Sequence, residues 1–285
     1  MKNVFFTGSS GFIGRNVCPY LSTKHRLFIP RRDELNLLDE KEVLDYIKSN
    51  HIDIVINAAN PNAIRTDRDL KDKEFEDRLR IFLNIRNARE LFDFCYNIGS
   101  GAEYNKAYDI KMVSEFEYGK TIPYDSYGMA KYAMHEISKN DENIIDLITF
   151  AIFGPTDHYS KFITHCIDSC KKNVDITIRQ DCYFDYLYVM DFAKILDFFI
   201  NHIPKYKEYN ITTGNRYLLS DIAKIVMDVM NVSNNIVFLH DGLNNEYTAD
   251  NARLCEELGE FSFTSLRDGI IGQINGEIKN EEKSC

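Results

Sequence analysis

The sequence has no apolar run that approaches the roughly 20 residues needed to cross a bilayer. Its start shows no charged leader, long apolar segment or small-residue cleavage site, because Met1 and Lys2 precede an apolar strand directly. We therefore expect no export signal, and a cytoplasmic protein without membrane contact.

Clustered cysteines are also missing. The seven cysteines are scattered along the chain, and only Cys166 and Cys170 lie close together. One pair at helical spacing is not a zinc pattern, which would need a second pair. We expect reduced thiols, several of them in the core, and no metal site.

Positive charge is scarce. With a net charge of -10, the chain has no basic stripe to offset repulsion from phosphates, which argues against nucleic acid as a partner. Any ligand that carries phosphate must be held by local contacts.

The sequence also lacks internal repeats, low-complexity tracts and linkers rich in Gly, Ser or Pro. Its 285 residues therefore indicate one large core, or two lobes that share a tight boundary.

A glycine-rich turn stands near the start of the chain. An apolar strand that begins at Val4 is followed by glycines at Gly8, Gly11 and Gly14. A predicted helix over 12–21 begins between the second and the third of them. Because glycine has no Cβ, Gly8 permits a sharp turn and Gly11 permits close approach of the backbone to a pyrophosphate. Gly14 permits close packing of the helix on the strand. The helix N-terminus adds a partial positive charge. The pattern predicts a dinucleotide-binding turn, with a tight turn that binds no ligand as the alternative.

The end of the second predicted strand, 26–30, bears on cofactor choice. Arg31 and Arg32 follow this strand. A carboxylate here suits the ribose of NAD, whereas arginine suits the 2′-phosphate of NADP. We expect NADPH; the alternatives are that the two arginines form a solvated turn, or that Asp33 serves an NAD ribose.

Helices and strands then alternate. A strand over 52–57, nearly continuous in Ile and Val, is typical of a buried parallel sheet. Small residues from Asn57 to Asn60 follow at its carboxyl end, where open α/β sheets bind ligands. We also expect helices over 40–49, about 69–90, 160–170, 220–230 and 252–259, and strands over 92–98, 144–153, 175–179 and 209–213. A further strand leads into a helix within 184–200. On the helix over about 69–90, the side chains of Phe82, Ile85 and Leu91 should face the sheet.

Tyr127 and Lys131 are four residues apart, so on a helix they share one face. The ammonium stabilises the phenolate and lowers the tyrosine pKa from about 10 toward working pH, which lets the phenol give a proton to a carbonyl oxygen. The alternative is a surface Tyr and Lys on an amphipathic helix.

With both motifs in place, the chain resembles the extended short-chain dehydrogenase/reductases that act on nucleotide sugars, over nearly its whole length. TGSSGFIG resembles their cofactor loop, NAAN a motif after a strand, Ser100 their catalytic serine and YGMAK their Tyr-x-x-x-Lys. FGP at 153–155, DYLYVMD at 185–191 and YNITTG at 209–214 are similar to landmarks of their sugar-binding half.

The resemblance implies an α/β fold, a Rossmann-type doubly wound parallel sheet with a smaller interleaved C-terminal α/β lobe for substrate. We expect a dinucleotide-binding domain over 1–152 and about 182–206, a sugar-nucleotide lobe over about 153–181 and 207–285, and a homodimer. The catalytic residues implied are Ser100, Tyr127 and Lys131. Those expected at the cofactor are Thr7, Gly8, Ser10, Gly11, Phe12, Ile13, Gly14, Arg31, Arg32, Asn57, Ala58, Ala59 and Lys131. Those expected at the substrate are Asn60, Ser100, Ala102, Glu103, Phe153, Lys161 and Arg179.

Within the family, RRDELNLLDEKEV is most similar to the GDP-fucose synthases, which use NADPH to epimerise and then reduce a GDP-4-keto-6-deoxy sugar. Their epimerising cysteine falls on Ala102, which cannot accept a proton, and their histidine falls on Lys161, with His165 one turn further. The dehydratase branch of the family has a Thr-Asp-Glu pattern, in which the Asp and the Glu act as acid and base to remove water. This chain has Gly101 and Ala102 at those two positions. Glu103 is one place too late and, in an extended segment, would point to the opposite face.

These comparisons of residues predict NADPH-dependent reduction of the C4 ketone of a nucleotide-linked 4-keto-(6-deoxy) sugar, without epimerisation. The alternatives are a nucleotide-sugar 4-epimerase with tightly bound NAD, and a non-catalytic dinucleotide-binding protein of the same fold. The nucleotide base, the carbon count of the sugar and the stereochemistry at C4 stay open. The choice between NADP and NAD, a role of Lys161 or His165 in epimerisation, and the oligomeric state stay open too.

Overall fold

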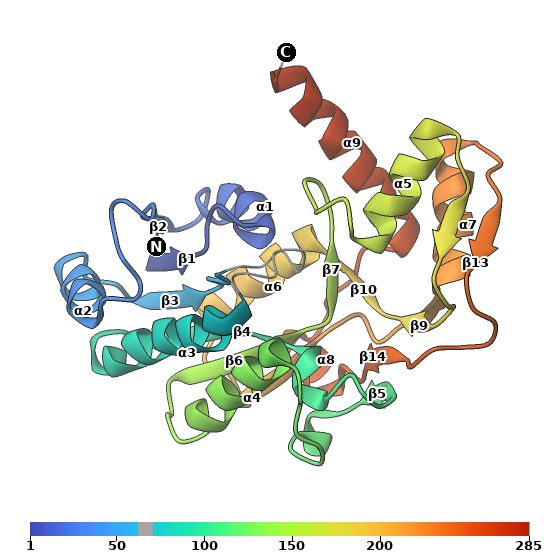
Figure 1. Ribbon diagram of the computed structural model, residues 1–285. Helices are drawn as coiled ribbons and strands as arrows, with labels where there is room; N and C mark the ends of the chain where they lie inside the picture. Colours follow the sequence, from blue (N-terminus) through green and yellow to red (C-terminus); the bar gives the residue numbers. More distant parts are fainter. Residues whose placement is uncertain (62–70, 285) are drawn as a thin grey trace.

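A computed structural model describes residues 1–61 and 71–284 of the chain (Figure 1). Six strands form its central sheet: Asn3–Thr7 (β1), Arg26–Phe28 (β2), Ile54–Asn57 (β3), Phe94–Ser100 (β4), Ile144–Thr149 (β6) and Glu208–Ile211 (β11). Every pairing is parallel, in the order β11-β6-β4-β3-β1-β2. The predicted parallel α/β sheet is confirmed.

The direction in which strands are added reverses at β1, because β2 lies on one side of it and β3 on the other. Such a switch point leaves a crevice beyond the carboxyl ends of the two strands, since the connections from them leave toward opposite faces of the sheet. The topology alone therefore places a ligand site where β1 and β3 end.

Helices cover both faces of the sheet (Figure 1). They are Phe12–Leu21 (α1) and Val189–Asn201 (α6) on one face, and Glu40–Ser49 (α2), Lys71–Asn87 (α3) and Ser126–Ser138 (α4) on the other. Val4 and Phe6 belong to the core under α1 and α6, whereas Phe5 belongs to the core under α2 and α3. Because successive strand residues point to opposite faces, one continuous apolar strand supplies both cores.

The expected bounds of α1 and α2 are confirmed. For the long helix expected from Asp69, that start lies outside the described residues, and Phe82 and Ile85 are buried as predicted. The prediction for Leu91 is wrong, because its side chain is 38% exposed. The helix ends at Asn87, and Leu91 lies in a separate short 3-10 helix, Arg89–Leu91 (η2), that leaves the inner face.

A second lobe lies on the far side of the sheet from α2 (Figure 1). Its core is formed by Phe162–Lys172 (α5), Leu219–Met230 (α7), Ile176–Ile178 (β8), Ile236–Phe238 (β13) and the first turns of Leu266–Ser284 (α9). Two further sheets connect the lobes: Tyr217–Leu218 (β12), Tyr183–Phe184 (β9), Tyr247–Ala249 (β14) and Ile110–Val113 (β5) in one, and Tyr186–Tyr188 (β10) with Ala151–Phe153 (β7) in the other. Short elements complete the chain: Gly101–Tyr104 (η3), Glu115–Glu117 (η4) and Ala252–Leu258 (α8).

The expected boundary near residue 207 needs a correction. The strand β11, which we assigned to the second lobe, pairs with β6 as the edge of the central sheet, and α8 packs beside it. Conversely, β5 lies within residues 1–152, which we assigned to the dinucleotide-binding domain, but it pairs with β14 in the sheet β12-β9-β14-β5. The lobes are interleaved as expected, but the C-terminal part of the chain contributes to both of them.

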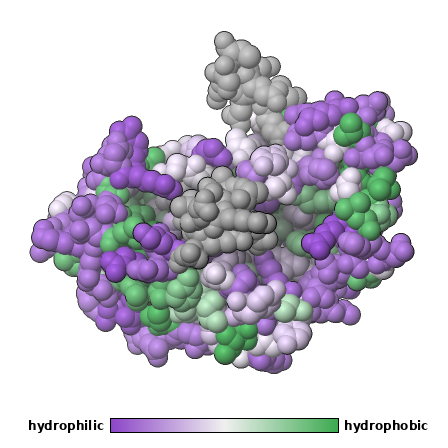
Figure 2. Space-filling view, viewed as in Figure 1, coloured by the Kyte–Doolittle hydropathy of each residue, from purple (hydrophilic) through white to green (hydrophobic). Residues whose placement is uncertain are grey.

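Polar residues dominate the face shown in Figure 2. None of the helices in the described ranges is long and apolar enough to cross a membrane. Five cysteines, Cys18, Cys95, Cys166, Cys170 and Cys182, are buried as free thiols, as predicted, and Cys255 is exposed.

A row of polar side chains crosses the buried sheet, from the carboxyl ends of β1 and β3 to the middle of β4 and β6. Thr7, Asn57, Asn97 and Asp146 occupy directly paired positions of β1, β3, β4 and β6. Asn57 Nδ2 donates to Asn97 Oδ1 at 2.9 Å, and Asn97 Nδ2 donates to Asp146 Oδ1 at 2.6 Å. Buried polar groups are stable only when they are paired in this way. The row therefore fixes the register of the strands that carry the crevice.

The variant Asn97→Ala tests this row. It leaves the Asn57 amide and the Asp146 carboxylate without their shared partner, so we expect the free energy of unfolding to fall by about 2–5 kcal/mol. Urea denaturation measures this loss. The control is Asn235→Ala, at an exposed asparagine that bonds Asp175, with an expected change within about 0.5 kcal/mol. Equal losses in the two variants would contradict a stabilising role for the row.

Candidate active site

The glycine turn fits closely against the end of β3. Gly8 has φ +74, and a Cβ there would lie 2.6 Å from the Ala58 carbonyl oxygen. A Cβ on Gly14 would lie 2.4 Å from the Ser9 Cα. Both positions require glycine, because backbone atoms occupy the space. The Ala59 N–H donates to Thr7 Oγ1 at 3.1 Å and joins the two strand ends that border the crevice.

The N-terminus of α1 is open toward this crevice. Gly11 is the N-cap residue in extended conformation, and no side chain caps the helix. Ser10 and Gly11 are exposed, whereas Phe12 and Ile13 pack their side chains against the core, so the backbone is what the turn offers to a ligand. Uncapped N–H groups and the helix dipole together suit an anion. These residues fit the pyrophosphate of a dinucleotide.

The two arginines after β2 lie in an exposed turn. The Arg31 side chain is 73% exposed, and its guanidinium lies 3.1 Å from Asp33 Oδ2 and 3.7 Å from Glu34 Oε1. Arg32 is exposed too. Surface ion pairs of this kind are worth at most about 1 kcal/mol, so they leave Arg31 free to exchange a carboxylate for a phosphate.

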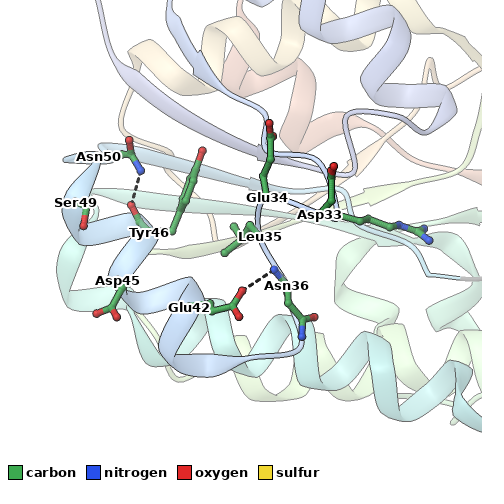
Figure 3. Close-up of a pocket in the computed structure, with 10 residues that line it drawn as sticks. Asp33, Glu34, Leu35, Asn36, Glu42, Asp45, Tyr46, Ser49 and Asn50 are labelled. Carbon is green, nitrogen blue, oxygen red and sulfur yellow. Dashed lines mark hydrogen bonds between the residues drawn. The ribbon is translucent and has the colours of Figure 1, made fainter.

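A hollow of about 600 Å³ beside this turn is not the cofactor crevice (Figure 3). It lies between the segment that starts at Arg32 and α2, and its wall includes Arg32 and four carboxylates, those of Asp33, Glu34, Glu42 and Asp45. Carboxylates in this number repel phosphates. The glycine turn and the Tyr127–Lys131 pair are not part of its lining.

The predicted Tyr–Lys pair stands on the first turns of α4. Asp125 caps this helix, since its side chain accepts a hydrogen bond from the Gly128 N–H at 2.9 Å. The helical spacing then puts Tyr127 and Lys131 on one face, as predicted. A Cβ on Gly128 would lie 2.8 Å from the Ala102 carbonyl oxygen, so α4 packs directly on the turn that follows Ser100.

Lys131 is 5% exposed, and its Nζ donates to the Ile98 carbonyl oxygen at 2.6 Å. Burial lowers the pKa of Lys131 to about 8; Glu103 opposes this shift, and the positive charge of Arg78 adds to it. Its ammonium is therefore held beside β4 by a neutral acceptor, without an acidic side chain bonded to it among the described residues.

Ser100 is the last residue of β4. It is 6% exposed, and its Oγ accepts a hydrogen bond from the Ala102 N–H at 3.3 Å. Its neighbour across the sheet is Thr149, at the end of β6. Ser100 therefore lies at the carboxyl edge of the sheet, beside the helix that carries Tyr127 and Lys131.

The expectation for Glu103 and Ala102 at the substrate needs a correction. The segment after Ser100 is the 3-10 helix η3 rather than an extended strand, and both residues are fully buried. Glu103 accepts from the Ser100 N–H at 2.6 Å and lies 2.9 Å from His135 Nδ1. Both carboxylate oxygens are thus engaged inside the protein. Burial lowers the pKa of His135, but Asp146 and Glu103 outweigh this and raise it, which favours the charged form of the ring beside the Glu103 carboxylate.

Phe153, also expected at the substrate, is 1% exposed and packs against Tyr186 and Tyr188 in the core of the second lobe. This burial makes Phe153 unavailable to a ligand. The loop that follows Phe153 runs to α1. There Asn16 Nδ2 donates to the Pro155 carbonyl oxygen at 2.9 Å.

The polar candidates of the second lobe are exposed. Lys161 is the N-cap residue of α5, and the half-buried His165 follows one turn later. Arg179 follows β8, and its carbonyl oxygen accepts from the His240 N–H at 2.9 Å. No described residue forms an ion pair with Lys161 or Arg179, so both side chains have their charge available for an anionic ligand.

Sequence reasoning missed Arg78. This residue of α3 is 2% exposed, its Nε donates to Asn60 Oδ1 at 2.5 Å, and its guanidinium carbon lies 5.0 Å from the centroid of the Tyr127 ring. A signal was present, because Arg78 precedes Phe82 by four residues and so stands on the buried stripe of its helix. A charged residue on such a stripe needs a buried partner.

In the described part of the chain, no group of His, Cys, Asp and Glu side chains is arranged to hold a metal ion. The polar groups at or beside the carboxyl ends of β3 and β4 are instead the Tyr127 phenol, the Lys131 ammonium, the Ser100 hydroxyl and the Arg78 guanidinium. Together they suit proton transfer to an oxygen atom of a bound molecule beside a dinucleotide.

The chain is similar to known proteins in sequence and in fold. The sequence is similar to GDP-L-colitose synthase from Yersinia pseudotuberculosis, with 23% identity over 278 residues, covering 82% of this chain and 84% of that protein. The fold is similar to a GDP-mannoheptose C4 reductase from Campylobacter jejuni with NADP bound, with a TM-score of 0.81 and 17% identity over 96% of this chain and 98% of that one. It is also similar to a GDP-L-fucose synthetase from Naegleria fowleri bound to NADP, with a TM-score of 0.84 and 15% identity over 99% and 94% of the two chains.

The sequence also matches the family described as "NAD dependent epimerase/dehydratase family" over residues 4–212. This match includes the glycine turn, Ser100 and the Tyr127–Lys131 pair, and it covers most of the chain. The resemblance on which the sequence analysis relied is confirmed: the chain belongs to the NAD dependent epimerase/dehydratase family.

Proposed function

We propose that this protein uses NADPH to reduce the C4 ketone of a nucleotide-linked 4-keto sugar, without epimerisation. One observation carries the proposal: Tyr127 and Lys131 share a face of α4 at the carboxyl edge of the sheet, with the Lys131 ammonium buried against the Ile98 carbonyl oxygen. Similar proteins are described as acting on GDP-linked sugars, and two of the similar structures contain NADP.

NADPH supplies a hydride when it is bound across the crevice. The residues that would hold it are the glycine turn at its pyrophosphate, Arg31 and Arg32 at its 2′-phosphate, Ala58 and Ala59 along its length, and Lys131 at the nicotinamide ribose. The glycine turn, Ala58 and Ala59 lie at the carboxyl ends of β1 and β3, the arginines follow β2, and Lys131 lies in the second turn of α4.

Tyr127 gives its proton to the ketone oxygen as this oxygen becomes an alkoxide. Ser100 donates a hydrogen bond to the same oxygen, since its hydroxyl accepts from the Ala102 N–H and keeps its own proton to donate. The buried ammonium of Lys131 favours the phenolate that remains, because Coulomb interactions are stronger away from water.

Epimerisation needs a group that removes a proton from carbon, and the position of the family's cysteine does not supply one. Ala102 has only a methyl group and is fully buried, and Glu103 is bonded to Ser100 and His135. The same two residues argue against dehydration of the sugar. Arg179, Lys161 and Asn60 are proposed at the substrate, the first of them at its diphosphate. We also propose a homodimer, which sedimentation analysis would test.

A panel of substrates tests the reaction. The protein is incubated with NADPH and GDP-, dTDP- or CDP-linked 4-keto sugars, and the absorbance of the reduced nicotinamide is followed. We expect oxidation of NADPH with at least one of them, and a product that differs from the substrate only at C4. Protein that instead retains NAD through gel filtration and interconverts C4 epimers would contradict the proposal.

Replacement of the acid gives the second test. In Tyr127→Phe the ring stays but the proton is gone, so kcat should fall by about 10²- to 10⁴-fold. The affinity for NADPH, measured by fluorescence titration, should be nearly unchanged. Tyr132→Phe, on the same helix, is the control and should keep its turnover. If Tyr127→Phe stays active, another group donates the proton.

The pH dependence follows from Lys131. Its pKa is lowered to about 8, so the ammonium is present below this pH and is lost above it. We expect kcat/KM for ketone reduction to fall as the pH rises through about 8, because kcat/KM reports groups of the free enzyme. A flat profile up to about pH 10, the usual lysine value, would show that Lys131 remains charged.

Cofactor preference tests the arginine turn. Removal of a charge-assisted hydrogen bond to the 2′-phosphate costs about 1.5–3 kcal/mol, so Arg31→Ala or Arg32→Ala should raise the KM for NADPH by about 10- to 100-fold. The KM for NADH should hardly change. Arg26→Ala, at the start of β2 and beyond this turn, is the matched control. Equal effects on both cofactors would remove these arginines from the site.

A further inference from the structure

The guanidinium of Arg78 is held in one place by four hydrogen bonds. Its Nε donates to Asn60 Oδ1, and its Nη1 donates to the Glu74 carbonyl oxygen. Its Nη2 donates both to the Pro61 carbonyl oxygen and to Glu74 Oε1. Asn60 and Pro61 follow the end of β3 by three and four residues, beside the crevice. Arg78 therefore connects α3 with the edge of the sheet, in a position that a flexible surface arginine would not keep.

This fixed guanidinium lies over the Tyr127 ring. The guanidinium carbon is 5.0 Å from the ring centroid, within the range of a cation–π interaction, and Arg78 is only 2% exposed. A desolvated contact of this type is stronger than one at the surface. An ion pair with Glu74, whose side chain is 18% exposed, offsets part of the positive charge.

We propose that Arg78 is a positioning residue for the reduction: it holds the Tyr127 ring against α3 and places a second positive charge beside the Tyr127–Lys131 pair. The inference rests on the proposed function for its consequence in catalysis, but its physical content concerns Tyr127 alone. Arginine suits this role because its planar group stacks on a ring and stays charged at every working pH.

The charge acts on both members of the pair in the same direction. A cation next to the ring stabilises the phenolate more than the phenol, so it lowers the pKa of Tyr127. For Lys131, burial lowers the pKa most, Glu103 raises it, and Arg78 lowers it further. Since two groups this close titrate as a pair, removal of Arg78 should move the alkaline limb of activity upward.

Other charges also face the pair from the surrounding elements. In the described ranges they are Glu74 on α3, Glu103 on η3, Asp125 before α4, His135 on α4 and Asp146 on β6. Glu103 is paired with His135, and Asp146 is bonded to Asn97. Glu74 is thus the acidic group that balances Arg78, and neutralising it should have the opposite effect.

A titration of Tyr127 tests the inference without substrate or cofactor. Tyrosinate has its own ultraviolet absorbance, and subtraction of the curve of a matching Tyr127→Phe protein isolates this residue among the 17 tyrosines. The variants are Arg78→Met, which removes charge and hydrogen bonds, and Arg78→Gln, which keeps a donor for Asn60 but no charge. Glu74→Gln completes the set. The control is Arg80→Met, at an exposed residue of the same helix.

We expect the pKa of Tyr127 to rise by about one to two units in Arg78→Met and Arg78→Gln, to fall in Glu74→Gln and to stay constant in Arg80→Met. The alkaline limb of kcat/KM should move in the same directions. A residue with a purely structural role would lower stability in the Arg78 variants without these opposite shifts. If Arg78→Met does not fold, Arg78→Gln and Glu74→Gln decide the question.

Unchanged titration of Tyr127 in the folded Arg78 variants, or a shift of the same sign in Glu74→Gln, would overturn the inference. Failure of the proposed function has a different result: no 4-keto sugar nucleotide is reduced, although the titration still shifts. The two outcomes are therefore distinguishable in one set of proteins.

Discussion

The candidate site depends on the buried contact between the Lys131 ammonium and the Ile98 carbonyl oxygen. This contact joins α4 to the end of β4 and sets the position of the face that carries Tyr127. Burial of an ammonium costs free energy and lowers its pKa, here to about 8. The reduction that we propose gives a reason for this cost, because a proton-donating phenol needs a cation beside it, and perturbed groups of this kind are typical of functional sites.

The surroundings of this contact divide the charges between catalysis and structure. Glu103 is the carboxylate that would neutralise Lys131, but it is bonded to the Ser100 N–H and paired with His135 instead. Arg78 stands on the other side of the site and faces the Tyr127 ring. The positive charges thus face the phenol, while the negative charge is turned into the core.

The central sheet determines where these groups meet the cofactor loop. Parallel strands end at one edge, and the reversal of strand order at β1 opens the crevice there. The polar row through Asn97 keeps β1, β3, β4 and β6 in register, so Gly8, Asn60 and Ser100 stay adjacent to the same crevice. The exchange of strands between the lobes through β5 and β11 gives the second lobe a fixed place beside it.

The sequence alone determined the features that depend on neighbours along the chain: the glycine spacing of the turn, the helical Tyr127–Lys131 pair, and the apolar strands of a parallel sheet. Only the tertiary structure decided the rest. It placed β11 in the central sheet, buried Phe153, turned Glu103 toward His135, and brought Arg78 to Tyr127. The physical reason is that periodicity and spacing report contacts within one or two helical turns, whereas these four outcomes are contacts between elements far apart in the chain.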